Sequence, residues 1–139
     1  MKAYRLLMAM LLALSAAHAG ARTPVPIVNH ENVVVQAAPG RNATADQVKQ
    51  AIIAAASATG RKWVVSEAAP GQLVATYQVR THTVTTDIRY SASQFSVAYK
   101  DSVNMKYGPG PGGAPSIHPF YNQWVSEFVQ AIRAELAKT

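Results

Sequence analysis

Hydrophobic and polar residues alternate along residues 72–102, a pattern typical of β-strands that bury one face. Up to Val79 the hydrophobic residues hold odd positions, whereas from Val84 to Tyr90 they hold even positions. One continuous strand would put the two sets on opposite faces, so we expect a turn or a bulge near residues 80–82. A further turn is predicted over residues 91–93, before a last strand that reaches residue 102.

Two other segments have the periodicity of helices. The first spans residues 44–59, where Thr44 and Gln47 have the spacing of a capping box and Gly60 follows as the stop. The second begins near Pro119, which we place at the first helical position, N1. Glu127 is expected on the solvent-exposed face of this helix. Its hydrophobic residues recur at helical spacing and are Tyr121, Trp124, Val125, Phe128, Ile132 and Leu136.

Two more strands are predicted over residues 31–38 and 61–67, because each segment contains consecutive β-branched residues. The order of elements is then strand, helix, four strands and helix. Short turns between consecutive strands favour antiparallel pairing. We therefore predict an α+β two-layer sandwich, in which an antiparallel sheet of about four to five strands carries two helices on one face.

The N-terminus has the three parts of a secretory signal peptide. Lys2 and Arg5 precede an unbroken apolar run, and a small-x-small cleavage site ends at Ala19. A buried N-terminal helix is the alternative interpretation. Because position 20 is Gly and not Cys, we expect a periplasmic protein that is not lipid-anchored.

The chain then divides into three parts. We predict a signal peptide over residues 1–19, a flexible N-terminal arm over residues 20–29 and a single α+β domain over residues 30–139. Two prolines and the absence of any periodicity favour the arm. No segment after the signal peptide is apolar for long enough to be a transmembrane helix.

The net charge of +6 changes this picture little. Loss of Lys2 and Arg5 with the signal peptide leaves 11 basic residues against 7 acidic ones, a net charge of +4. These basic residues are scattered and do not alternate with aromatic residues, so we expect no nucleic-acid partner. A weak affinity for anionic lipids or cell-wall polymers fits the predicted location better. With 0 Cys, the chain has no disulfide and no thiolate metal site.

Residues that could carry catalysis are few. His30, His82 and His118 do not have the spacing of metal ligands, and the chain has neither a nucleophile elbow nor an assignable pair of carboxylates. After the signal peptide only Met105 is left to support metal binding by methionine. We therefore predict a protein that is not an enzyme and that has no cofactor and no metal.

Polar residues gather on both sides of a low-complexity Gly-Pro loop, residues 108–115. The loop is either a long connector or a mobile recognition loop. The polar residues either fasten a strand end to a helix start or line a pocket for a ligand or partner. They are Asp101, Ser102, Asn104, His118, Tyr121 and Asn122.

The same region carries a resemblance. The tyrosine-rich strand pair, the Asp101-Ser102-x-Asn104-x-x-Tyr107 segment and the Ile117-His118-Pro119-x-Tyr121-Asn122-x-Trp124 helix start resemble those of small uncharacterised proteobacterial envelope proteins. The resemblance covers residues 44–138. Many members look like lipoproteins, whereas this chain lacks the anchoring cysteine. The resemblance implies the fold and the location and carries no activity.

Taken together, the sequence predicts a non-catalytic envelope module with a binding or adaptor role, whose partner is another envelope protein. The alternative is a small-ligand-binding protein or an enzyme with a polar site around His118, Tyr121 and Asp101. The oligomeric state is left open.

Overall fold

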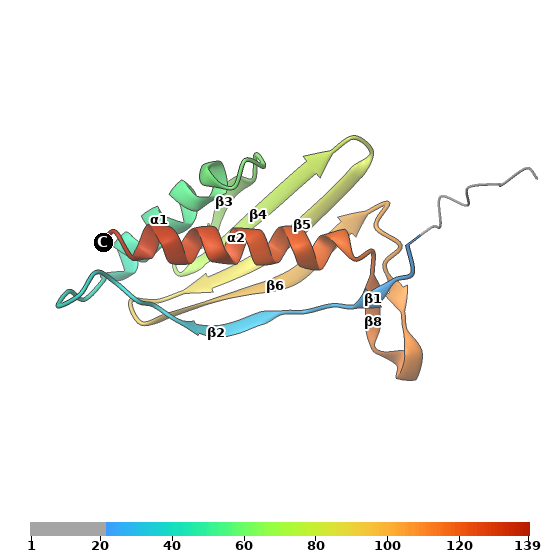
Figure 1. Cartoon of the computed structure of the whole chain (residues 1–139), viewed down its shortest axis with the longest axis horizontal. Coiled ribbons are helices and arrows are strands. Elements are labelled where there is room, and N and C mark those ends of the chain that lie inside the picture. Colours follow the sequence, from blue (N-terminus) through green and yellow to red (C-terminus); the bar gives the residue numbers. More distant parts are fainter. Residues whose placement is uncertain (1–21) are drawn as a thin grey trace, which may run out of the picture.

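The computed structural model describes residues 22–139, so the predicted signal peptide lies outside the described residues. A five-stranded antiparallel sheet with the order β2-β6-β5-β4-β3 forms one layer, and helices α1 and α2 lie side by side across one of its faces (Figure 1). The predicted α+β two-layer sandwich is confirmed. The elements are β2 (His30–Val34), α1 (Ala45–Ala58), β3 (Val64–Ala69), β4 (Gln72–Val79), β5 (His82–Tyr90), β6 (Gln94–Val103) and α2 (Phe120–Leu136).

The switch from odd to even hydrophobic positions is explained by a tight turn. Val79 pairs with His82, so Arg80 and Thr81 form a two-residue hairpin loop between β4 and β5. The predicted turn near residues 80–82 is confirmed. The side chains that it brings to one face are buried, namely Leu73, Ala75 and Tyr77 of β4 and Val84, Thr86 and Ile88 of β5.

A β-bulge in β6 was not predicted. Thr85 pairs with Asp101 but the next residue, Thr86, pairs with Tyr99, so Lys100 is the extra residue. The bulge separates the buried part of β6, which holds Phe95 and Val97, from its exposed end. At the bulge, Tyr99 stacks on Tyr107 of the segment that leads to α2, with ring centroids 4.6 Å apart.

A second, small sheet is the main difference from the prediction. It has the order β1-β8-β7, with β1 (Val25–Pro26), β7 (Gly108–Pro109) and β8 (Pro115–Ile117), and a 3-10 turn η1 (Pro111–Gly113) connects β7 to β8. The Gly-Pro loop is therefore largely folded as a short hairpin. Its prolines are tolerated because strands of two or three residues leave many backbone N–H groups outside the ladder.

The prediction of a flexible arm over residues 20–29 is wrong for its second half. Val25 and Pro26 pair with Ile117 and Ser116 of β8. Ile27 is partly buried against the core. The prolines that favoured an arm instead fit an extended edge strand. Residues 25–28 are thus fastened across the start of α2.

Helix α1 has the predicted start. Thr44 Oγ1 accepts a hydrogen bond from the Gln47 backbone N–H at 3.2 Å, and Gln47 Oε1 accepts one from the Thr44 N–H at 2.9 Å. This is the reciprocal capping box. Helix α2 begins one residue later than predicted, because Pro119 occupies the N-cap and not the N1 position.

Aromatic contacts join α2 to the sheet layer. Trp63 stacks on Phe128 with ring centroids 4.9 Å apart, and Tyr77 meets Trp124 edge-on at 5.1 Å. The strand predicted over residues 61–67 begins only at Val64, because Trp63 turns into this core from the loop before it. Neither helix of the described residues 22–139 is long and apolar enough to cross a membrane.

The capping box leads to a first prediction. Thr44→Ala removes the side-chain oxygen that caps α1, and we expect the free energy of unfolding to fall by about 0.5–2 kcal/mol. Chemical denaturation followed by circular dichroism measures the change. The control is Ser57→Ala, at an exposed position of the same helix, for which we expect a change within about 0.5 kcal/mol. Equal effects of the two substitutions would contradict the role of the cap.

Candidate functional site

The six polar residues predicted as a site lie in, or just beside, the end of β6 and the start of α2, at one end of the molecule. The end of β6, strand β8 and the start of α2 come together at the end away from the C-terminus (Figure 1). Most of these side chains bond to neighbouring loops and strands.

Asn122 fastens β1 to α2. Its side-chain Nδ2 donates to the Pro26 carbonyl at 2.9 Å, and its Oδ1 accepts from the Val28 N–H at 3.0 Å. The amide thus satisfies one backbone acceptor and one backbone donor of a segment 94 and 96 residues away in sequence. Asn122 has the role of a structural latch, which is one of the two interpretations that the sequence left open.

Asn104 joins the end of β6 to the β4–β5 turn. Its Nδ2 donates to Thr81 Oγ1 at 2.8 Å, and its backbone carbonyl accepts from His82 Nδ1 at 2.7 Å. Asn104 adopts a positive φ of 57°, which a short polar side chain tolerates well. The two hydrogen bonds hold the hairpin loop against the segment that leads to α2.

His118 caps the start of α2. Its ring Nδ1 accepts a hydrogen bond from the Phe120 backbone N–H at 3.1 Å, and the His118 backbone N–H donates to the Met105 carbonyl at 2.8 Å. Burial, together with the positive charges of Lys106 and Arg22, lowers the pKa of His118. The ring is therefore neutral at pH 7 and carries its proton on Nε2, because Nδ1 is an acceptor.

Asp101, Ser102 and Tyr121 do not form a reactive group. Asp101 is exposed, and its Oδ1 accepts from the Ser102 N–H at 2.8 Å. The Ser102 hydroxyl bonds to the Tyr99 hydroxyl at 2.9 Å. Tyr121 is fully buried, its hydroxyl has no hydrogen-bond partner among the described residues, and burial raises its pKa. No substrate in solvent can reach that hydroxyl.

A pocket of about 270 Å³ opens between the β4–β5 turn and the start of α2, and we call it the end pocket. Of the six predicted residues only His118 lines it. The other lining residues are Val79, Arg80, His82, Met105, Phe120 and Trp124. The sequence analysis assigned Trp124 to the core and His82 to a turn. The close approach of a hairpin loop to a helix start has no local sequence signal.

The charges around the end pocket are all positive. Arg80 is the charged residue of its lining, and the Arg22 guanidinium lies 4.4 Å from the centre of the Phe120 ring. Lys106 Nζ donates to the Arg22 carbonyl at 3.4 Å. No acidic side chain is among the lining residues. An anion in the pocket would therefore meet attraction on several sides.

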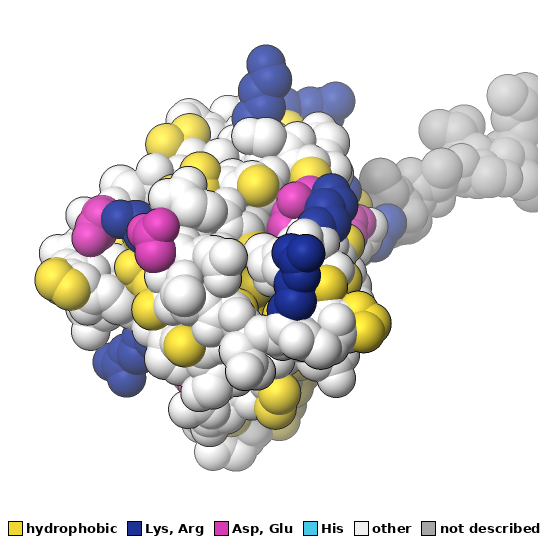
Figure 2. Space-filling model, turned by 90° about the vertical axis from the view of Figure 1, so that its left-hand side faces the viewer, with side chains coloured by type: hydrophobic (Ala, Val, Ile, Leu, Met, Phe, Trp, Pro, Cys, Tyr) yellow, Lys and Arg dark blue, Asp and Glu magenta, His cyan; other side chains and the backbone are white. Residues whose placement is uncertain are grey.

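The opposite end of the molecule, where α2 ends, is different. Figure 2 shows that several acidic side chains there lie beside Lys or Arg side chains, while hydrophobic atoms appear in small separate groups. Lys49 pairs with Glu67, and Lys138 with Glu135. Acidic side chains thus pair with some of the basic ones at this end, whereas no acidic side chain lines the end pocket.

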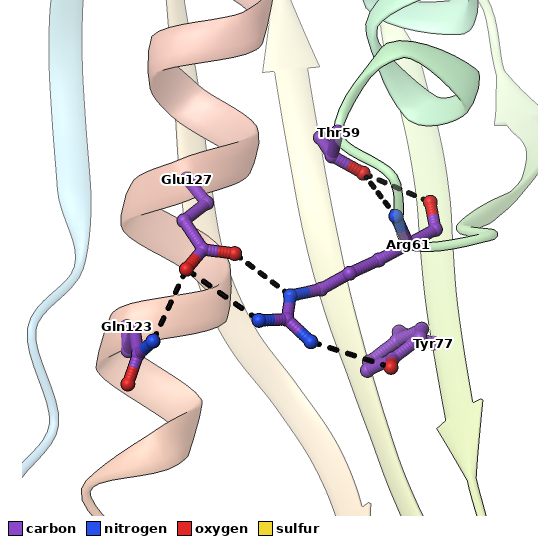
Figure 3. Close-up of polar contacts among 5 residues, drawn as sticks. All are labelled: Thr59, Arg61, Tyr77, Gln123 and Glu127. Atoms are coloured by element: carbon purple, nitrogen blue, oxygen red, sulfur yellow. Dashed lines mark hydrogen bonds and ion pairs between the residues drawn. The ribbon is translucent and has the colours of Figure 1, made fainter.

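A polar network between the layers was missed by the sequence analysis. Arg61 Nε donates to Glu127 Oε2 at 2.7 Å, and its second guanidinium nitrogen reaches the Tyr77 hydroxyl at 3.5 Å (Figure 3). Thr59 holds the Arg61 backbone, and Gln123 donates to Glu127 at 3.2 Å. The Arg61 guanidinium lowers the pKa of Glu127. Glu127, expected to face solvent, is thus a half-buried carboxylate that ties α2 to the loop after α1.

Two observations limit the chemistry. Among residues 22–139, no group of three or more His, Asp or Glu side chains is placed to hold a metal ion. Comparison with known proteins finds no matching family model, curated protein or solved structure. The resemblance to envelope proteins therefore stays a prediction, and the end pocket itself must carry the argument on function.

The buried Tyr121 hydroxyl leads to a second prediction. Tyr121→Phe removes a hydroxyl that has no hydrogen-bond partner within residues 22–139, and burial of such a group costs about 1–3 kcal/mol. We expect the free energy of unfolding in urea to stay the same or to rise. The matched control is Tyr99→Phe, which loses the hydrogen bond to Ser102 and should lower it by about 1 kcal/mol. A larger loss for Tyr121→Phe than for Tyr99→Phe would show that the hydroxyl has a structural or chemical partner.

Proposed function

We propose that this protein is exported to the periplasm and acts there as a non-catalytic binding module of the cell envelope, with the end pocket as its binding site. The observation that carries the proposal is the end pocket, a concave and mostly apolar site with a few polar groups at its edge. Such sites are where small ligands bind in most proteins. Its volume of about 270 Å³ suits a small molecule or one anchoring side chain of a partner protein.

The hydrogen bonds around the end pocket support a binding role over catalysis. His118 and His82 each use Nδ1 on the backbone, which holds the rings in place. Asp101 and Tyr121, the other members of the alternative enzyme site, do not line the pocket. A general base needs a second group that orients it and a reachable substrate proton. The three residues of the alternative site do not supply that arrangement together.

Export leads to a third prediction. In a Gram-negative host, the full chain should be recovered from the periplasmic fraction with Gly20 as its first residue, as shown by N-terminal sequencing and intact mass. Leu12→Arg places a charge in the apolar run. The precursor, still carrying residues 1–19, should then stay in the cytoplasmic fraction. The control is Arg41→Ala, which also changes the net charge by one unit but lies outside the signal peptide. Uncleaved wild-type protein in the cytoplasm would contradict export.

Binding at the end pocket leads to a fourth prediction. In a fragment screen by NMR on ¹⁵N-labelled mature protein, amide signals near the pocket should shift together, those of His82, Met105 and Phe120 among them. Val79→Phe fills the pocket wall and should abolish these shifts. Val64→Phe, at a position 69 % exposed on the edge strand β3, is the matched control and should leave them intact.

Thermal unfolding of both Phe variants shows whether each is folded. Shifts that gather on another surface, or shifts that persist in folded Val79→Phe, would contradict the end pocket as the binding site. A protein partner that binds the sheet edge and leaves the pocket unaffected would also contradict the end pocket as the binding site, and would place the adaptor role on a different surface.

A further inference from the structure

The end pocket combines apolar walls with an uncompensated positive charge. Val79, Met105, Phe120 and Trp124 supply the walls, and the rings of Phe120 and Trp124 stack with centroids 5.6 Å apart. Arg80 belongs to the lining. Arg22 lies over the ring of Phe120, which also lines the pocket, and Lys106 contacts Arg22. We propose, resting on the proposed function, that the end pocket binds a small amphipathic monoanion, namely a carboxylate on an aromatic or aliphatic body.

Two residues that line the end pocket, Arg80 and His118, can supply hydrogen-bond donors of the kind that a carboxylate binds. The Arg80 guanidinium has no hydrogen-bond or ion-pair partner among residues 22–139, so its donors are open to a ligand. The neutral His118 ring has its N–H on Nε2, because its Nδ1 accepts from the Phe120 N–H. A guanidinium and one imidazole N–H match the two oxygens of a carboxylate. A highly charged phosphate would find too few donors on these apolar walls.

The backbone supplies a second and independent argument. Four non-glycine residues among the described ones have positive φ, and three of them surround the end pocket: Arg80 at 55°, Asn104 at 57° and Lys106 at 54°. Each costs folding energy that glycine would avoid, and glycine or asparagine is the usual choice at such turn positions. Asn104 is explained by its bond to Thr81. The Arg80 side chain has no hydrogen bond or ion pair among residues 22–139, and Lys106 Nζ makes only the contact of 3.4 Å to the Arg22 carbonyl.

Two cations are thus kept at turn positions where folding alone favours glycine. Residues in such conformations gather at ligand clamps, where the strain serves binding. The substitution Arg80→Gly distinguishes a role of Arg80 in ligand binding from a role in stability. Arg80→Gly should leave folding unharmed and weaken ligand binding, whereas a residue kept for stability would show the reverse.

The test uses isothermal titration calorimetry on the mature protein with four probes. Two are carboxylates, 2-naphthoate and octanoate, and two are neutral counterparts, 2-naphthol and octan-1-ol. We expect the carboxylates to bind more tightly than their neutral counterparts and more weakly as salt is raised. Arg80→Gly should weaken carboxylate binding about tenfold, as expected for loss of a charged hydrogen bond. The naphthoate and octanoate arms distinguish an aromatic from an aliphatic body.

The control is Arg41→Gly, which makes the same substitution and the same change of net charge on an exposed loop. It should leave every affinity unchanged. Urea unfolding of Arg80→Gly should give a midpoint equal to or above that of wild type. Equal affinity for acids and neutral probes, or carboxylate binding unaffected by Arg80→Gly, would overturn the proposed ligand class and leave the end pocket as a binding site. No binding of any probe would also overturn it, and the fragment screen then decides separately on the pocket.

Discussion

The packing of α2 against the inner face of the sheet is the interaction on which the rest of the structure depends. One side of the helix is buried along its full length, from Tyr121 to Leu136. Each large side chain of this kind contributes about 1.5–3 kcal/mol when it is fully buried. Two aromatic contacts, Trp63 with Phe128 and Tyr77 with Trp124, fix the position of the helix along the sheet. Helix α1 packs beside α2 and completes the layer.

The end pocket follows from this packing. Because α2 is held along the sheet, its first turn lies next to the β4–β5 hairpin loop and to the segment after β6. The three pieces meet at their ends, where side chains fill space less completely than in the middle of the layer. Phe120 and Trp124 thus form both the last part of the core and the wall of the pocket. Stability and the proposed binding therefore share these two residues.

Polar side chains hold this end together. The amide of Asn122 replaces missing strand partners of the β1 segment, and Asn104 and His118 do the same for the turns around them. Each such bond contributes about 0.5–1.5 kcal/mol, and its loss leaves a backbone group unpaired. The Arg61–Glu127 network plays a similar part halfway along α2, where it joins the loop after α1 to the helix (Figure 3). The polar residues are therefore mostly fasteners, and the cations at the end pocket stand apart from them.

The sequence by itself determined the two helices, the five strands of the larger sheet and the class of fold. The change from odd to even positions required the turn at Arg80 and Thr81, and the spacing of Thr44 and Gln47 defined the start of α1. These features are local, since a period or a cap is read from residues that are neighbours in the chain. The candidate site was predicted only in part: the sequence pointed to the end of the molecule where the end pocket lies and to His118, but it missed the rest of the pocket wall.

Only the tertiary structure decided what depends on distant residues. Val25 and Pro26 became a strand because β8, about 90 residues away in sequence, offered them partners. Glu127 became half-buried because Arg61 reached it from the loop after α1. The end pocket exists because a hairpin loop and a helix start come together, and the same approach leaves Arg80 beside Phe120 and Trp124 without a carboxylate. Such contacts join residues far apart along the chain, and no pattern in a single sequence records which of them will meet.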